Sequence, residues 1–139
     1  MMQLDPAELE KKIRDASLRP TKQRIALARL LFSGGNRHIT AERLHGEAMD
    51  AGVTVSLATI YNNLHQFTSA GLLREVVVDS SRSYFDTNVS AHHHFFHEDS
   101  GSLEDIPDTA LSVANIPSLP EGTEISSVDV IVRVSNIRR

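Results

Sequence analysis

An α+β fold in two parts is predicted by three features of the sequence. Four segments before residue 72 repeat apolar residues at helical spacing, and two short strand patterns follow them directly. Beyond residue 88 the pattern changes to a histidine cluster, a strand, a short helix and a closing strand. We therefore expect a helical first domain that ends in a hairpin, residues 1–88, and a small α/β second domain, residues 89–139.

The helices of the first domain are predicted by their capping residues and their apolar stripes. The first helix follows Asp5-Pro6 and ends before Arg19-Pro20, because a residue before proline avoids helical torsions. Thr21, Thr40 and Ser56 stand where a side-chain oxygen caps the next three helices. The predicted buried stripes are Leu9 and Ile13, then Ile25, Ala28, Leu31 and Phe32, then Leu44 and Ala48, then Ile60, Leu64 and Phe67.

Residues 73–78 and 83–87 are typical of two strands around the polar turn 79–82. Helices followed by a hairpin predict a winged helix-turn-helix, in which the last helix enters the major groove of DNA and the hairpin lies near the phosphates. Short polar side chains lie opposite the apolar stripe of the fourth helix. The second helix starts with cationic side chains. The candidate DNA-binding residues are Arg19, Lys22, Gln23, Arg24, Ser56, Thr59, Tyr61, Asn62 and Asn63. A merely solvated face fits the periodicity equally well.

Charge and composition narrow the class of protein. Residues 1–75 carry ten Lys and Arg against eight Asp and Glu, whereas residues 76–139 carry four against ten, so the two sums are +2 and −6. A DNA-facing first half and an acidic second half fit this asymmetry. The sequence has no cysteine, which excludes disulfides and thiolate-bound zinc. No stretch predicts a membrane helix or a signal peptide, so a cytoplasmic protein is expected.

The second domain is predicted to associate with another copy. Val128, Val130, Val132 and Val134 alternate with other residues, which predicts a long strand with one apolar face. A short helix is expected between Pro107 and Pro117. Two or three strands and one helix form little core, so a homodimer or a higher oligomer is expected through these strands.

The histidine cluster is a candidate metal site. In an extended segment, alternation places His92 and His94 on one face and His93 on the other. With Asp86 they form a set of two imidazoles and one carboxylate, which suits Fe(II), Mn(II) or Zn(II). A solvated histidine-rich turn is the alternative. His38 and Asp105 are too distant in sequence to be assigned by spacing.

Several motifs stand in the order found in ferric uptake regulators, and the chain is identified as resembling that superfamily. The motifs are Arg19-Pro-Thr-Lys-Gln-Arg24, His38-Ile-Thr-Ala-Glu42 and Val55-Ser-Leu-Ala-Thr-Ile-Tyr61. Segments 60–68, 84–89 and 92–96 are most similar to the iron response regulators of alphaproteobacteria. Asn62 stands where most of the superfamily has arginine, which suggests a different operator.

The resemblance implies ligands that spacing does not assign. Superfamily regulatory sites match a metal set of His38, Asp86, His92, His94 and Asp105. The iron response regulators imply a haem site at His92, His93 and His94. Where many members have a Cys-x-x-Cys pair for structural zinc, this chain has His97 and Ser100, so that zinc site is not expected.

The function implied is repression of iron and haem genes by binding to double-stranded operator DNA, modulated by a divalent metal, by haem, or by both. The alternative is a metal-corepressor regulator of the peroxide, manganese or ferric uptake type. A non-haem iron enzyme is a distant alternative, because little of the chain remains to build a substrate pocket, and we expect no enzyme. The sequence does not determine the operator sequence, the metal present in cells or the way in which haem acts. It also does not determine whether the protein is a dimer or a tetramer.

Overall fold

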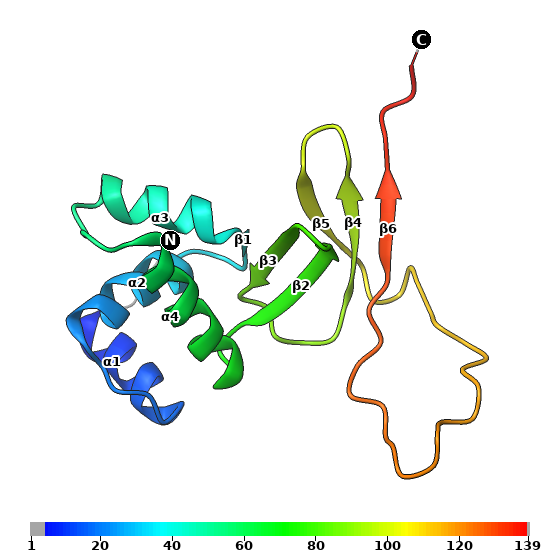
Figure 1. Cartoon of the computed structure of the whole chain (residues 1–139), viewed down its shortest axis with the longest axis horizontal. Coiled ribbons are helices and arrows are strands. Elements are labelled where there is room, and N and C mark those ends of the chain that lie inside the picture. Colours follow the sequence, from blue (N-terminus) through cyan, green and yellow to red (C-terminus); the bar gives the residue numbers. More distant parts are fainter. Residues whose placement is uncertain (1–4, 139) are drawn as a thin grey trace. The chain divides into compact units, whose positions relative to one another are not determined.

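The computed structural model describes residues 5–138. Along these residues, four helices and six strands follow one another, with the first strand between the second and third helices (Figure 1). The chain divides into two compact units between Val89 and Ser90. They are called unit 1 and unit 2.

Four capped helices form most of unit 1: α1 (Pro6–Asp15), α2 (Lys22–Phe32), α3 (Ala41–Asp50) and α4 (Leu57–Ser69). Asp5, Thr21, Thr40 and Ser56 each precede one helix, and each side chain accepts a hydrogen bond from the backbone N–H three residues on. Such a cap stabilises a helix by about 1 kcal/mol. The predicted caps at Thr21, Thr40 and Ser56 are confirmed.

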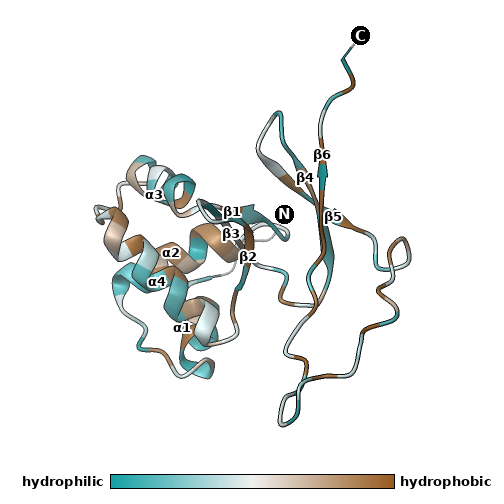
Figure 2. Ribbon diagram, turned by 45° about the vertical axis from the view of Figure 1, so that its right-hand side comes forward, coloured by the Kyte–Doolittle hydropathy of each residue, from teal (hydrophilic) through white to brown (hydrophobic). Residues whose placement is uncertain are grey.

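The apolar stripes of these helices pack into two clusters, a main core and a smaller one. Figure 2 shows apolar and polar residues on different sides of the helices of unit 1. Leu9 and Ile13 of α1 pack against Ala28 of α2 in a smaller cluster. The main core consists of Leu27, Leu31, Ile39, Ala41, Leu44, Ala48, Val55, Ile60, Leu64, Phe67, Leu73 and Phe85.

A three-stranded sheet completes unit 1. Its strands are β1 (His38–Ile39), β2 (Arg74–Asp79) and β3 (Arg82–Asp86), in the order β1-β3-β2. The predicted hairpin is therefore present, with its strands one residue away from the expected bounds. β1 was not predicted, and it pairs antiparallel with β3, so that His38 lies opposite Asp86.

Unit 2 holds a second three-stranded sheet: β4 (His93–His97), β5 (Ser102–Ile106) and β6 (Ile131–Val134), in the order β5-β4-β6. β4 and β5 form an antiparallel hairpin, and β6 pairs parallel with β4. The closing strand is shorter than predicted, and its residues Ile131, Val132 and Val134 are only half-buried. Val128 is exposed. The apolar residues of this strand therefore leave surface for a partner.

The helix predicted between Pro107 and Pro117 is wrong. Residues 107–130 contain turns, but neither helix nor strand. The predicted helix would lie between two prolines, and Asn115 within it adopts a left-handed φ of 61°. So short a helix forms too few hydrogen bonds to offset the free-energy cost of nucleation, unless it packs an apolar face against the rest of the protein. Here Val113 and Ile116 are exposed.

Candidate metal centre and DNA-binding surface

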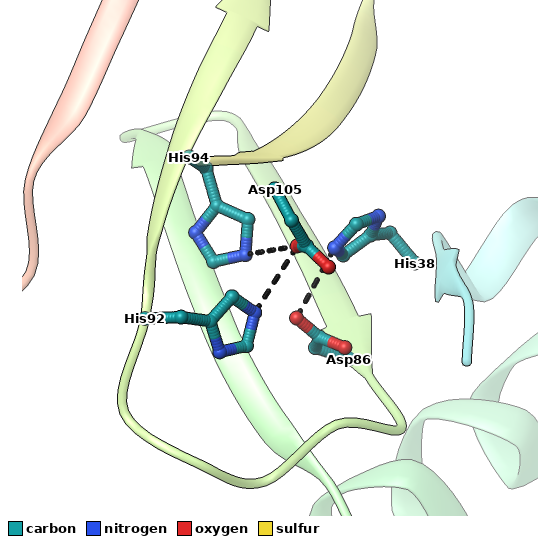
Figure 3. Close-up of side chains that lie close together, drawn as sticks. All are labelled: His38, Asp86, His92, His94 and Asp105. Atoms are coloured by element: carbon teal, nitrogen blue, oxygen red, sulfur yellow. Dashed lines mark ion pairs between the residues drawn. The ribbon is translucent and has the colours of Figure 1, made fainter. Parts of the chain in front are cut away.

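The first pair of candidate ligands lies in unit 1. The antiparallel pairing of β1 with β3 brings His38 Nε2 to 3.1 Å from Asp86 Oδ2 (Figure 3). The other oxygen of Asp86 accepts a hydrogen bond from Asn88 N at 2.8 Å. Next to this pair, Arg37 and Thr87 exchange hydrogen bonds, from Arg37 N to Thr87 Oγ1 at 2.9 Å and from Thr87 N to Arg37 O at 3.1 Å. Backbone pairing therefore fixes both ligands.

The second group of candidate ligands lies in unit 2. His94 of β4 lies opposite Asp105 of β5, and its Nε2 is 3.3 Å from Asp105 Oδ1. His92, two residues earlier, places its Nε2 3.1 Å from the same oxygen. The two rings are 4.5 Å apart at their centroids (Figure 3). This geometry puts His92 and His94 together, as the predicted alternation requires.

His93 takes the other side of this alternation. Its Nδ1 accepts a hydrogen bond from Val130 N at 3.0 Å. In a neutral imidazole the proton then resides on Nε2. His93 thus links β4 to the segment before β6 through this hydrogen bond.

The contacts of His92 favour a proton or a metal ion beside its Nε2 atom. Its Nδ1 is 2.6 Å from Ser90 O, and a carbonyl oxygen can only accept, so Nδ1 carries a proton. A neutral ring then has a lone pair at Nε2, which faces the Asp105 carboxylate at 3.1 Å. Two acceptors at this distance repel each other unless a proton or a metal ion lies between them. The Ser90 carbonyl thus orients His92 as outer-sphere partners orient metal-bound histidines.

Distances and donor chemistry within each unit fit a divalent ion. Two ligands bound at about 2.1 Å, with angles of about 90–109°, lie about 3.0–3.4 Å apart. The nitrogen–oxygen distances of 3.1, 3.1 and 3.3 Å fall in this range. The ligands are imidazoles and carboxylates, which suit Fe(II), Mn(II) or Zn(II). Without cysteine in the chain, no thiolate-bound structural zinc can form.

The positions that could have held structural zinc have other contacts. His97 Nε2 lies 2.7 Å from Glu104 Oε1 on the neighbouring strand. The hydroxyls of Ser100 and Ser102 are 2.9 Å apart in the hairpin turn. These groups therefore brace the β4–β5 hairpin.

Most of the predicted DNA-binding side chains lie on the surface of unit 1. Ser56 Oγ caps α4 and also donates to Thr59 Oγ1 at 2.9 Å. The hydroxyl of Tyr61 donates to Glu42 Oε1 at 2.7 Å, and this carboxylate raises the pKa of Tyr61. The exposed residues of the set are Arg19, Lys22, Gln23, Ser56, Tyr61 and Asn62, the half-buried ones are Arg24 and Thr59, and Asn63 is buried.

A groove joins the last helix to the hairpin. It has a volume of about 480 Å³, and Tyr61 and Glu42 line it together with the hairpin turn 79–83. Glu42 appears in the sequence only as the last residue of the motif 38–42, and its contact with Tyr61 spans 19 residues. No local sequence signal shows this contact.

Unit 1 is thus a winged helix, an architecture in which the last helix and the hairpin meet DNA. Residues 15–133 match the ferric uptake regulator family, and the chain belongs to this family. It is therefore a transcription regulator and not an enzyme, and the predicted α+β class is confirmed.

Relatives and solved structures agree with the family. The peroxide-responsive repressor PerR of Staphylococcus aureus is 38% identical over 101 residues, which cover 70% of this chain and 68% of that protein. The ferric uptake regulator of Pseudomonas aeruginosa with manganese has a TM-score of 0.70 and 26% identity, covering 93% of this chain and 98% of that one. The peroxide stress regulator of Campylobacter jejuni has the same fold, with a TM-score of 0.59, 21% identity, and coverage of 94% and 95%.

These relatives support the family and its metal dependence, whereas the finer resemblance to iron response regulators stays a prediction. Separately, no helix among residues 5–138 is both long and apolar enough to cross a lipid bilayer.

Proposed function

We propose that the chain represses transcription by binding operator DNA when a divalent ion occupies a single site made of His38, Asp86, His92, His94 and Asp105. The observation that carries the proposal is His92, whose Nε2 faces a carboxylate oxygen while its Nδ1 is held by a carbonyl. A proton or a metal ion between the two groups would relieve their repulsion, and the proposal takes it to be the metal ion. We place the protein in the cytoplasm, with the DNA.

In this proposal the ion links the two units. His38 and Asp86 belong to unit 1, and the other three ligands belong to unit 2. Neither group alone supplies more than three ligands, so one ion that takes ligands from both would complete its coordination only at one angle between the units. In a dimer that angle sets the spacing of the two α4 helices against the ~34 Å repeat of DNA. Metal occupancy then controls operator affinity.

The DNA contacts follow from the exposed side chains. We assign base reading to α4, with Tyr61 and Asn62 as the outermost groups, because both are exposed on this helix. Arg19, Lys22 and Gln23 are exposed around the start of α2, where cations and helix-start N–H groups favour phosphate. A second copy of the chain would dock on unit 2, where Val113, Ile116 and Val128 are exposed.

In the hypothesis that we favour, the metal acts as a corepressor, so that the protein binds DNA when the metal is bound. PerR of Staphylococcus aureus is named a peroxide-responsive repressor, and the Pseudomonas aeruginosa regulator was solved with manganese. The first name supports repression and the second supports metal binding, and we propose that the bound ion is required for DNA binding. An Fe(II) ion on imidazole and carboxylate ligands would also make the site sensitive to peroxide.

A haem-responsive regulator of iron and haem genes is the second candidate, and a pocket in unit 2 favours it. The pocket has a volume of about 410 Å³ and is lined by His92 and His93, with apolar walls that include Ile106, Leu111 and Val128. His93 carries its proton on Nε2 while Val130 N donates to Nδ1, so it would give up that bond to ligate iron. His92 is then the preferred axial ligand, and haem would compete with the divalent ion for it.

Metal binding is tested by titrating the EDTA-treated protein with Mn(II) and following free Mn(II) by electron paramagnetic resonance. One ion per chain, lost in both H38A and H92A, supports a shared site. Binding that survives in H38A would show that unit 2 alone holds the ion, and the linking role would fail.

Haem is tested separately by its absorption spectrum. A Soret band that shifts on binding, and that H92A removes while H93A keeps, supports haem ligation by His92. The same spectrum in wild type, H92A and H93A would contradict it.

A further inference from the structure

Asn62 and Asn63 are consecutive on α4 but have different surroundings. Asn62 is exposed, whereas Asn63 is 7% exposed. The amide nitrogen of Asn63 donates to Thr59 O at 2.9 Å, and its Oδ1 accepts from Arg24 Nε at 3.2 Å. Both ends of the Asn63 amide are therefore engaged within unit 1.

The guanidinium of Arg24 is held by three acceptors. Besides the bond to Asn63, its Nη1 donates to Arg19 O at 3.0 Å, and its Nη2 donates to Gln66 Oε1. A guanidinium has five N–H donors, so two remain for another ligand. Arg24 stands at the start of α2, and Asn63 and Gln66 stand on α4, so these bonds join two helices that both face DNA in the proposed function.

The acceptors that hold Arg24 are all neutral, which distinguishes it from Arg37 and Arg82. Arg37 pairs with Glu47 at 2.6 Å, and Arg82 pairs with Asp79 at 2.6 Å. A carboxylate partner cancels the arginine charge, whereas amide and carbonyl oxygens leave it in place. Arg24 is thus a half-buried cation that is fixed in orientation and keeps its charge. Such a group is suited to a phosphate oxygen.

We propose that Asn63 is a positioning residue, which holds Arg24 ready for the DNA backbone, and that it does not read bases. This inference rests on the proposed function, in which α4 and the start of α2 meet DNA. Holding the side chain in place removes the loss of rotamer freedom that a mobile arginine suffers on binding. A phosphate contact adds affinity for every sequence, whereas a base contact adds preference for one.

The exposed neighbour Asn62 provides a matched control. Using Mn(II)-loaded full-length protein, affinity is measured for a duplex selected from a random-sequence pool and for a scrambled duplex of equal composition. We expect N63A to weaken binding to both duplexes by the same factor, about tenfold. N62A should lower affinity for the selected duplex only. A change in the ratio of the two affinities in N63A, as in N62A, would overturn the inference.

A double-mutant cycle tests the route through Arg24. R24A should weaken binding and reduce the slope of log affinity against log salt by about 0.9 per protomer. In the R24A background, N63A should have no further effect. Additive losses would show that Asn63 acts independently of Arg24, and the positioning role would fail. Because Asn63 is buried, Q66A gives a second variant at an exposed position, and we expect a smaller loss of the same kind.

The arginine itself can be observed without DNA. In the free protein, the Arg24 Nε–H should exchange slowly with water in nuclear magnetic resonance spectra, and N63A but not N62A should speed this exchange. Equal exchange in wild type and N63A would contradict the positioning role. A protein that protects Arg24 yet binds no duplex would contradict the proposed function instead, so the two failures are distinguishable.

Discussion

Unit 1 and unit 2 differ in how much of their stability lies within the chain. Unit 1 has four capped helices around a core of a dozen buried residues. Among the described residues of unit 2, Phe96 and Ile106 are the buried apolar side chains, and 24 residues between β5 and β6 form neither helix nor strand. Unit 1 therefore has a core of its own, whereas the stability of unit 2 depends more on a ligand or a second copy of the chain. Such a difference suits the proposed regulator, because binding then changes unit 2 more than unit 1.

The largest expected effect tests the core of unit 1. Phe67 is fully buried and packs near Phe32, with ring centroids 6.4 Å apart. F67A should lower the free energy of unfolding by about 3–5 kcal/mol, since it removes a large side chain and leaves a cavity. The control is V132A on β6, which is only half-buried and should cost less than about 1.5 kcal/mol in thermal or urea unfolding. Equal losses of the free energy of unfolding in F67A and V132A would contradict the difference in internal stability between the two units.

Metal ligation is the next effect in size. H94A removes an imidazole whose Nε2 is 3.3 Å from Asp105 Oδ1, and it should weaken Mn(II) binding by more than about 100-fold, with loss of the rise in melting temperature that Mn(II) produces. H97A is the matched control on the same strand, because His97 pairs with Glu104 at the other end of the hairpin. If H97A matched H94A in calorimetry, the assigned ligand set would be wrong.

The smallest effect concerns a surface ion pair of unit 1. Glu47 accepts bonds from both terminal nitrogens of Arg37, at 3.0 and 2.6 Å, and this contact lowers the pKa of Glu47 below its ordinary value of 4.5. A lowered pKa means that the pair stabilises the fold above about pH 4.5 and that this stabilisation is lost as pH falls through the folded value.

E47Q should therefore cost less than about 1 kcal/mol at pH 7 and nothing once the carboxylate is protonated, as measured by urea unfolding across pH. E10Q serves as the control, because the Glu10–Arg14 pair is far more exposed and E10Q should change little at any pH. A larger cost of E47Q at low pH than at pH 7 would contradict the assigned sign.

Local signals made much of unit 1 predictable. Thr21, Thr40 and Ser56 cap helices as expected, because a cap depends on residues three positions apart. β1 was missed, since a strand of two residues carries no periodicity and exists through its pairing with β3. The helix expected after Pro107 was wrong, because isolated spacing says nothing about a packing partner.

The candidate sites were predictable to different degrees. The alternation of His92 and His94 follows from the sequence, whereas the pairing of Asp105 with both depends on the β4–β5 register. Asn63 was assigned to the polar face of α4 by helical spacing alone. Its bond to Arg24 crosses 39 residues, and spacing on one helix cannot show such a contact.

Operator binding measured by fluorescence anisotropy tests the central claim most directly. A labelled duplex, selected from a random-sequence pool with the Mn(II)-loaded protein, would be titrated with EDTA-treated protein, then with protein loaded with Mn(II), at fixed salt. We predict weak, sequence-independent binding without metal and tight, specific binding with it, and H92A should abolish the difference. Equal affinity in EDTA and in Mn(II) would contradict a metal-dependent repressor.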